Sequence, residues 1–372
     1  MVTVGKESVI SGAVEGVVTA QAAFHRGDPT AACVQARAAV EVLRELLGSG
    51  SPDVANVLVV QARAECLLGE LDAAERCARA AVESMARLPR GEQREVDRIR
   101  VQAAQALGQV LVTRGEYAQA GDCFRAALAD AEANLGAEDP DTAGLLTGLG
   151  LVGKYTGEFD AAAGCYERAL SILEASLGPG DAQVASLHHN LGGLAHSRGE
   201  PAAGEWHARR AVEIRQAALG GGHPDVAADK GAYAAILQRL GRLDEAERLS
   251  REALAAFERA YGEEHLEVGI ARTSLGAVLH QAGRLGEAER EYRVGLRIRE
   301  RQAGAMHPEL THTLVNLGSV IAERGETGEA RGLYERALWL LDGKVDGEHP
   351  TRVACEGLLA GLDTERERTS GR

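Results

Sequence analysis

The chain has 372 residues, of which 45% are hydrophobic and only 3% aromatic, and its formal net charge is −14. This charge argues against a general binder of nucleic acid or of anionic membranes, which needs an excess of Lys and Arg. No apolar run is long enough to span a bilayer, and residues 1–10 lack the basic-then-apolar layout of a secretory signal. The composition, dominated by Ala, Leu, Glu and Arg, predicts a helical, cytoplasmic protein of the kind found in GC-rich bacteria.

A regularly spaced glycine sets out the predicted elements in chain order. It stands in a short polar turn and recurs every 42 residues, with one gap of 46 at an insertion around Pro89 and Gly91 that is predicted to form a local loop. The series is Gly27, Gly69, Gly115, Gly157, Gly199, Gly241, Gly283 and Gly325. Self-similarity at a fixed period is the signature of stacked repeats. Each repeat is predicted to contain a first helix (A), a tight turn at this glycine, and a second helix (B).

A second series marks the boundaries between repeats. Its members are Asp139-Pro140, Asp181-Ala182, His223-Pro224, His265-Leu266, His307-Pro308 and His349-Pro350, preceded by Gly136, Gly178, Gly220, Gly262 and Gly304. Proline suits the first position of a helix, and glycine suits a helix end that turns left-handed. Because the four histidines follow the repeat period, they are predicted to have a structural role in the turn.

These signals predict a single array over residues 1–362. The predicted repeats cover 10–50, 52–93, 97–138, 139–180, 181–222, 223–264, 265–306 and 307–348, followed by a capping helix at 350–362 and a disordered tail at 363–372. The first repeat carries Thr19-Ala20 where most others carry Leu-Gly, so it is predicted to serve as an N-terminal cap.

Small residues recur where two helices are expected to cross closely. Two columns of helix B are small throughout, namely Ala32, Ala74, Ala120, Ala162, Gly204, Ala246, Ala288 and Ala330, and Ala39, Ala81, Ala127, Ala169, Ala211, Ala253, Gly295 and Ala337. Helix A repeats a Leu-Gly pair at Leu107-Gly108, Leu149-Gly150, Leu191-Gly192, Leu275-Gly276 and Leu317-Gly318. Glycine in mid-helix costs about 1 kcal/mol against Ala, so its repetition predicts a steric need for close approach by helix B.

These columns resemble the tetratricopeptide repeat. The 42-residue length and the phrases "AVEIRQAALGGGHPDVA" (211–227) and "HPELTHTLVNLGSVIAERGETGEARGLYERAL" (307–338) are similar to the kinesin-light-chain type, which is also common in bacteria. The resemblance covers about residues 10–360. It implies an all-α fold, an α-solenoid wound as a right-handed superhelix of about eight repeats, whose A helices line a concave groove that holds partner peptides.

The resemblance also implies which side chains face that groove. The family often places Asn before the Leu-Gly pair to hold peptide backbone, and only Asn190 and Asn316 match in this column. A second column would add a polar ladder of Lys154, His196, Gln238 and His280, and His189 and Arg239 adjoin these two columns. The alternative interpretation is that all of these side chains are solvated helix positions without a partner.

Catalytic and metal-binding motifs find little support. The sequence has no phosphate-binding loop and no nucleophile elbow, and the adjacent His188 and His189 point to different faces of a helix, unlike a zinc pair at i and i+4. The six cysteines, Cys33, Cys66, Cys77, Cys123, Cys165 and Cys355, form no C-x-x-C pair and are interpreted as small buried hydrophobes. We therefore expect no enzyme, no cofactor and no metal site.

Three functions remain open on the sequence. The first is an adaptor that binds a peptide segment of a partner protein in the groove. The second is a peptide- or ligand-responsive regulator that acts through a change in superhelix shape, and the third is an enzyme whose pocket is hidden in the groove. The expected partner is a protein or peptide, with neither nucleic acid nor membrane, and the sequence gives no indication of the oligomeric state.

Overall fold

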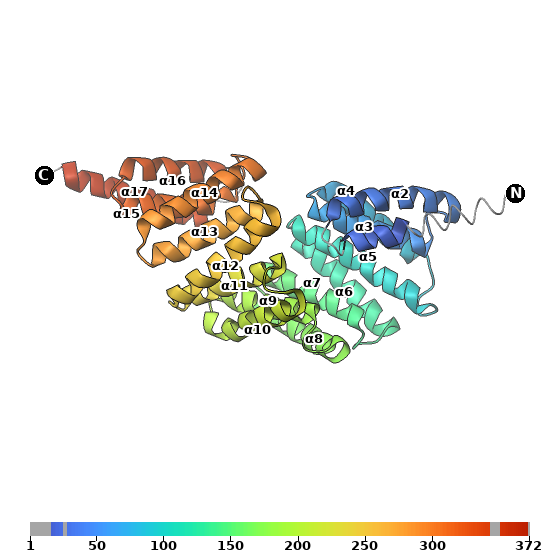
Figure 1. The fold of residues 1–372 in the computed structure, drawn as a ribbon. Coiled ribbons are helices and arrows are strands. Elements are labelled where there is room, and N and C mark those ends of the chain that lie inside the picture. The colour runs from blue at the N-terminus through green and yellow to red at the C-terminus, as the bar shows by residue number, and fades with distance from the viewer. Residues whose placement is uncertain (1–15, 25–27, 343–349, 371–372) are drawn as a thin grey trace. The chain divides into compact units, whose positions relative to one another are not determined.

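A computed structural model describes residues 16–24, 28–342 and 350–370, and all regular secondary structure within them is helical (Figure 1). Residues 16–24 form a first helix. The next helices are α2 (Pro29–Leu47), α3 (Pro52–Leu67), α4 (Leu71–Ala86), α5 (Arg94–Thr113), α6 (Tyr117–Asn134), α7 (Pro140–Thr156) and α8 (Phe159–Leu177). They are followed by α9 (Ala182–Arg198), α10 (Pro201–Leu219), α11 (Pro224–Arg239), α12 (Leu243–Tyr261), α13 (Leu266–Gln281), α14 (Leu285–Ala303), α15 (Leu310–Glu323), α16 (Thr327–Leu341) and α17 (Pro350–Ser370). Three features of the sequence prediction lie outside the described residues, namely the turn glycine Gly27, the boundary residue His349 and the start of the first repeat at residue 10.

The helices form two compact units, residues 1–179 and 180–372. Within each unit, A helices (odd numbers from α3 to α15) alternate with B helices (even numbers from α2 to α16), and each helix packs on the next. The backbones of successive A helices also approach one another, as those of α3 and α5 and of α9 and α11 do, whereas the described B helices of a unit meet through long side chains, as Arg168 on α8 meets Glu132 on α6. The A helices are therefore the more closely spaced layer, which makes their exposed face the concave side of each unit. The predicted all-α solenoid of paired helices is confirmed.

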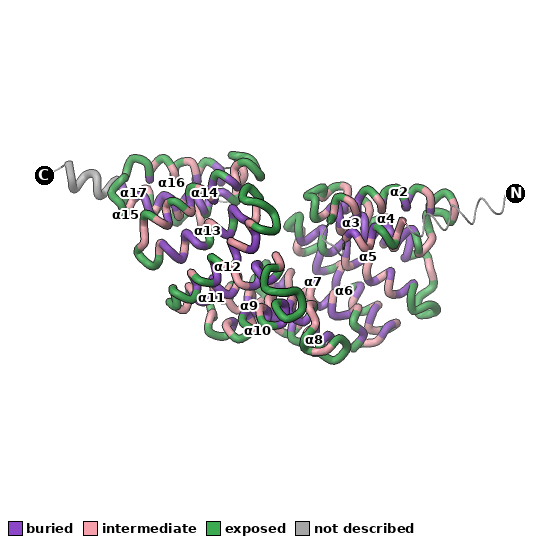
Figure 2. The backbone as a smooth tube through the Cα atoms, in the orientation of Figure 1, coloured by how far each residue is buried: buried purple, intermediate pink, exposed green. Residues whose placement is uncertain are grey.

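The buried residues lie mainly on the helix faces that are turned towards neighbouring helices (Figure 2). Both predicted small columns of helix B are buried at every position. The cysteine interpretation is only partly right, because Cys33 and Cys355 are buried while the other four cysteines are half-buried.

The glycines of the two series end the helices by different backbone conformations. Gly157 caps α7 with φ 83° and ψ 7°, the left-handed conformation that the turn requires. Gly178 caps α8 with φ 87° and ψ 158°, a combination essentially restricted to glycine. The prediction of a left-handed helix end at the second series is thus right for φ, whereas ψ is extended.

The boundary residues begin the A helices by capping them. The Asp139 carboxylate accepts a hydrogen bond from the Asp141 amide N at 3.0 Å, and the His223 Nδ1 accepts one from the Asp225 amide N at 3.2 Å. His265 caps α13 in the same way, and His307 Nδ1 accepts a hydrogen bond from the Glu309 amide N at 3.4 Å in the turn just before α15. The structural role in the turn that is predicted for these three histidines is confirmed.

Two boundaries differ from the sequence prediction. Helix α17 begins at Pro350 as predicted but continues to Ser370, so the segment predicted to be a disordered tail is helical through that residue. The insertion near Pro89 forms a loop and also lengthens α5, which has 20 residues where α7 has 17. The extra turn exists because α5 starts at Arg94, ahead of Asp97, which occupies the capping position of the other A helices.

The mid-helix glycines do admit a close approach by helix B. A Cβ atom on Gly150 would lie 2.5 Å from the Tyr166 ring, and one on Gly318 would lie 2.6 Å from the Tyr334 ring. At Gly192 the neighbour is instead the backbone of Ala208, whose N would lie 3.2 Å from the added atom. Each glycine therefore leaves the space that an aromatic ring or the backbone of helix B occupies.

Candidate functional site

A polar pocket of about 340 Å³ opens on the A-helix face of the second unit, between α9 and α11. It is lined by Ser186, His189, Asn190, Arg215, Asp225, Ala228 and Asp229. Two of these residues, His189 and Asn190, are among the side chains predicted to face the groove. Helix α10 supplies Arg215, so three helices build the pocket.

A hydrogen-bonded network forms the floor of this pocket. The two oxygens of the Asp229 carboxylate are divided between His189 Nδ1, at 2.8 Å, and Arg215 Nε, which donates at 2.6 Å. Arg215 Nη2 also donates to Ser186 Oγ at 3.1 Å. The side chains of Asp229 and Arg215 are only 2% and 11% exposed, whereas that of His189 is 36% exposed. Because Asp229 holds one ring nitrogen of His189, the other, Nε2, is left for a ligand.

Asn190 adds an amide group beside this network. It is half-buried and forms no hydrogen bond with any residue that the structure describes. A side-chain amide carries both donors and an acceptor, so it can pair with a peptide group presented in either sense. Asn316 is likewise half-buried and without a described hydrogen bond, but it lies on α15, outside the pocket.

The buried ion pair is unusual for its place in the repeat. The column of Asp229 holds Leu145, Leu187, Ala271 and Thr313 in other repeats, and the column of Arg215 holds Leu173, Phe257, Arg299 and Leu341. A buried ion pair is often no more stabilising than apolar side chains of similar size. The Asp229–Arg215 ion pair stands at two positions that are mostly apolar in the other repeats, which indicates a site for polar recognition. The sequence analysis missed Arg215 and Asp229, although a charged residue in an apolar column was a readable signal.

The remaining residues predicted for the second unit are not all available to a ligand. His280 Nε2 lies 2.8 Å from Glu323 Oε1, so a hydrogen-bond partner on α15 occupies this imidazole. Gln238 is half-buried and its backbone O accepts a hydrogen bond from Gln281 at 3.3 Å, while Arg239 is exposed and has no ion pair within the described residues. His196 is half-buried in the last turn of α9. These side chains do not form one uniform ladder.

Lys154 belongs to the first unit, on α7. Its side chain is half-buried, and burial lowers the pKa of its amine. No carboxylate of the described residues forms an ion pair with it. It is therefore a partly desolvated cation that an anionic group on a ligand would stabilise.

The A-helix face of the first unit carries a larger pocket, of about 570 Å³, between α3 and α5. Arg63 Nη2 donates to Gln105 Oε1 across it at 3.3 Å, and burial lowers the pKa of Arg63. Gln105 and Gln109 line this pocket, one residue before and three residues after Ala106, which stands in the predicted Asn column. The sequence analysis did not single out Arg63, because its column carries no repeated residue type.

His188 lies on a different face of α9 from His189, as their adjacency predicts. It is buried, and its Nδ1 lies 2.9 Å from the Nδ1 of His207 on α10. Burial, and then the charges of His207 and Arg210, lowers the pKa of His188 from 6.5 to about 4. The neutral imidazole is thus the form that the folded chain accommodates.

This shift predicts a stability that depends on pH. Because the pKa of His188 is lower in the folded than in the unfolded chain, its contribution is complete above pH 6.5 and is lost as the pH falls towards 4. The free energy of unfolding should fall by about 2–3 kcal/mol more across this window than in the variant His188→Leu. Two other repeats hold leucine at the position equivalent to His188, namely Leu146 and Leu314. Denaturant titrations of both proteins from pH 7 to pH 4 measure the difference, and parallel curves would contradict the assignment.

Comparison with known proteins agrees with this architecture. Tetratricopeptide repeat models match residues 100–175, 184–225 and 229–301, just over half of the chain, and no curated protein matches the sequence. A Rap protein complexed with competence and sporulation factor is 14% identical, with a TM-score of 0.61 over 95% of this chain and 98% of that one. A signal transduction ATPase with numerous domains and a tetratricopeptide repeat sensor, from Pyrococcus horikoshii, is 13% identical, with a TM-score of 0.61 over 86% and 46%.

A putative kinesin light chain from Podosopora anserina is 18% identical, with a TM-score of 0.48 over 55% of this chain and 96% of that chain. At these identities the two structures with a TM-score of 0.61 support the fold alone. Among the helices that the structure describes, none combines the length and the apolar character needed to cross a bilayer. The 42-residue helix pairs, the left-handed turn glycines and the matched repeats together show that the chain belongs to the tetratricopeptide repeat family.

Proposed function

We propose that the chain is an adaptor that binds an extended peptide segment of a partner protein along the A-helix face of its second unit. Tetratricopeptide repeat arrays are typically protein-binding scaffolds and usually non-catalytic. One observation carries the proposal for this chain. The half-buried Asn190 amide has no described partner and stands beside the His189–Asp229–Arg215 network in an open pocket.

The pocket suits a peptide backbone because it offers both kinds of hydrogen-bonding group. A peptide removed from water needs a partner for each of its N–H and C=O groups. The Asn190 amide can supply one donor and one acceptor, and the Arg215 guanidinium has Nη1 hydrogens that no described residue binds. His189 Nε2 offers a further position, whose character as donor or acceptor depends on the protonation of the ring.

We expect Asn190→Ala to weaken peptide binding about 5- to 150-fold, the range that corresponds to an unmet hydrogen bond of about 1–3 kcal/mol. Partners would be captured from a native lysate and identified, and a synthetic peptide from the captured region would be titrated by calorimetry. Glu213→Ala, on the exposed side of α10, is the matched control and should leave the affinity unchanged. A peptide that binds Asn190→Ala as tightly as the unsubstituted chain, yet is lost from the Glu213→Ala variant, would place the binding site on the other face.

The second candidate is a regulator whose shape responds to the bound peptide. Two observations favour it: the chain divides into two compact units at Pro179, and the similar Rap protein was solved with a bound factor. Small-angle scattering of the chain with and without the same peptide separates the two candidates. An unchanged curve supports the adaptor, and a changed curve supports the regulator.

A further inference from the structure

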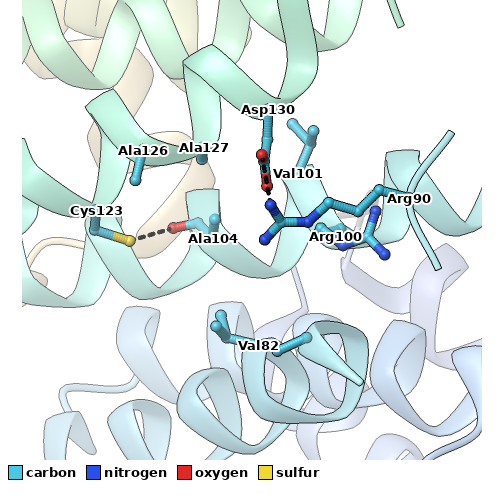
Figure 3. Close-up of a pocket in the computed structure, with 10 residues that line it drawn as sticks. Val82, Arg90, Arg100, Val101, Ala104, Cys123, Ala126, Ala127 and Asp130 are labelled. Atoms are coloured by element: carbon cyan, nitrogen blue, oxygen red, sulfur yellow. Dashed lines mark hydrogen bonds and ion pairs between the residues drawn. The ribbon is translucent and has the colours of Figure 1, made fainter. Parts of the chain in front are cut away.

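We propose that the first unit contains a second, independent binding site, for a small amphipathic carboxylic acid, on its B-helix side. A cavity of about 210 Å³ lies between α4, α5 and α6 (Figure 3). Val82, Ala104, Ala126 and Ala127 give it apolar walls, and the half-buried Cys123 lies on one side, where its Sγ donates to the Ala104 carbonyl O at 3.4 Å. Arg90, Arg100 and Asp130 gather at the other end, away from Cys123.

The cavity exists because two positions of the repeat hold small side chains here, where the later repeats hold larger ones. The column of Ala104 holds Leu146, His188, Lys230, Arg272 and Leu314 in the later repeats, and the column of Ala126 holds Arg168, Arg210, Glu252, Val294 and Arg336. In the second unit these larger side chains meet partners on the next B helix, as Lys230 Nζ meets Glu252 Oε2 at 2.7 Å and Arg272 Nη1 meets Glu291 Oε2 at 2.9 Å. In this repeat both positions hold alanine, Ala104 and Ala126, so the space that larger side chains occupy in the later repeats is left unfilled by the part of the chain that the structure describes.

At the polar end of the cavity, the Arg100 guanidinium has a hydrogen-bond donor without an acceptor among the described residues. Arg100 Nη2 donates to the carbonyl O atoms of Met85, Leu88 and Pro89 at 3.2–3.3 Å, and Nη1 pairs with Asp97. Arg100 Nε is nevertheless buried and has no hydrogen-bond partner in the described part of the chain. A buried donor left unpaired is costly, so a small shift of Arg100 that brings Nε into contact with a ligand oxygen would be favoured.

Arg90 is a second cation at this end of the cavity, so the acceptor group of a ligand is expected to be negatively charged. Arg90 lies in the loop at the insertion, its side chain is 57% exposed, and it pairs with Asp130 at 3.0 Å across the end of the cavity. An exposed ion pair of this kind is worth little, so a ligand carboxylate can compete with Asp130 for Arg90. Arg90 and Arg100 thus provide charge complementarity for a carboxylate whose apolar body lies against the alanines.

The volume limits the size of that body. An apolar cavity of 150 Å³ accommodates benzene, so about 210 Å³ suits an acid of roughly eight carbon atoms. Octanoate is the probe of matching size and charge, and 1-octanol has the same chain without the carboxylate. For a ligand of so few atoms we expect a dissociation constant of about 1 mM or below.

Cys123 provides a direct readout, and the next repeat contains its control. Cys165 occupies the same column and is also half-buried, but there Leu146 and Arg168 take the places of Ala104 and Ala126. Alkylation of the full chain by N-ethylmaleimide would be followed at both thiols by peptide mass spectrometry. Octanoate at saturation should slow alkylation of Cys123 about five-fold or more and leave Cys165 unchanged, with 1-octanol weaker than octanoate.

The variant Ala104→Leu should abolish this protection because leucine fills the cavity, as Leu146 and Leu314 do at the equivalent positions. Its folding would be checked by thermal melting, and Ala126→Leu replaces it if it does not fold. Arg90→Ala should reduce the preference for octanoate over 1-octanol. Equal protection of Cys123 and Cys165, protection that survives the filling substitution, or no protection at saturating octanoate would each overturn the proposal.

Discussion

Replacing Asp229 by leucine alone should destabilise the second unit by about 3–5 kcal/mol, because Arg215 would remain buried without its counter-charge. Asp229 is almost fully buried and accepts hydrogen bonds from Arg215 and His189, so leucine at this position would remove a partner from both side chains. The denaturant midpoint of the unit, followed by circular dichroism, measures the loss. A cost below about 1 kcal/mol would show that Arg215 finds another partner or reaches water.

The double variant Arg215→Leu/Asp229→Leu separates stability from recognition. Leu173 and Leu187 occupy the same two columns one repeat earlier, so the repeat accepts this pair of side chains. We expect the double variant to regain most of the stability lost in Asp229→Leu, since apolar replacement of a whole buried ion pair is often neutral or stabilising. It should nevertheless bind the partner peptide less well, because the floor of the polar pocket is gone. Full binding by a stable double variant would show that the ion pair serves only the fold.

The second large effect is expected at Gly150. Substitution by alanine adds a Cβ atom 2.5 Å from the ring of Tyr166, which is fully buried and cannot move aside. Overpacking of this kind costs about 1–3 kcal/mol or more. It opposes the gain of about 1 kcal/mol that alanine brings over glycine in a helix. We therefore expect net destabilisation of the first unit, measured by thermal and denaturant unfolding.

Gly164 is the matched control in the same repeat. It lies on the exposed side of α8, and a Cβ atom there would meet no heavy atom within 4 Å. Gly164→Ala should accordingly stabilise the unit by up to about 1 kcal/mol through helix propensity alone. The opposite signs of the two glycine substitutions are the expected result. If Gly150→Ala also stabilised the unit, the close approach of α8 to α7 would not be the reason for the repeated glycine.

The local features of this chain could be predicted from its sequence because each depends on a few neighbouring residues. Gly157 has to adopt a positive φ wherever a helix pair turns this tightly, and His223 caps a helix through a contact two residues ahead. The small residues of helix B could be predicted for a related reason. A contact repeated at a fixed period leaves the same residue type at the same interval, so the fold and its family followed from counting.

Only some residues of the candidate site could be predicted from the sequence. His189 and Asn190 occupy positions that the family pattern marks, but their partners come from elsewhere in the chain. Asp229 is 40 residues from His189 and 14 from Arg215, and the meeting of the three depends on how α9, α10 and α11 pack. Likewise only the packing of α13 on α15 brings Glu323 to His280 and occupies that imidazole.

The insertion illustrates the same limit. Its length and position could be read from the spacing of the glycines, whereas its partial use as an extra turn of α5 depends on the contacts of Asp97 and Arg100 with the preceding loop and the end of α4. The sequence by itself determined the repeat, its turns and the family, because these follow from local and periodic interactions. Only the tertiary structure decided which charged groups are paired, which polar atoms are left without partners and where cavities open, because these depend on contacts between helices that no period encodes.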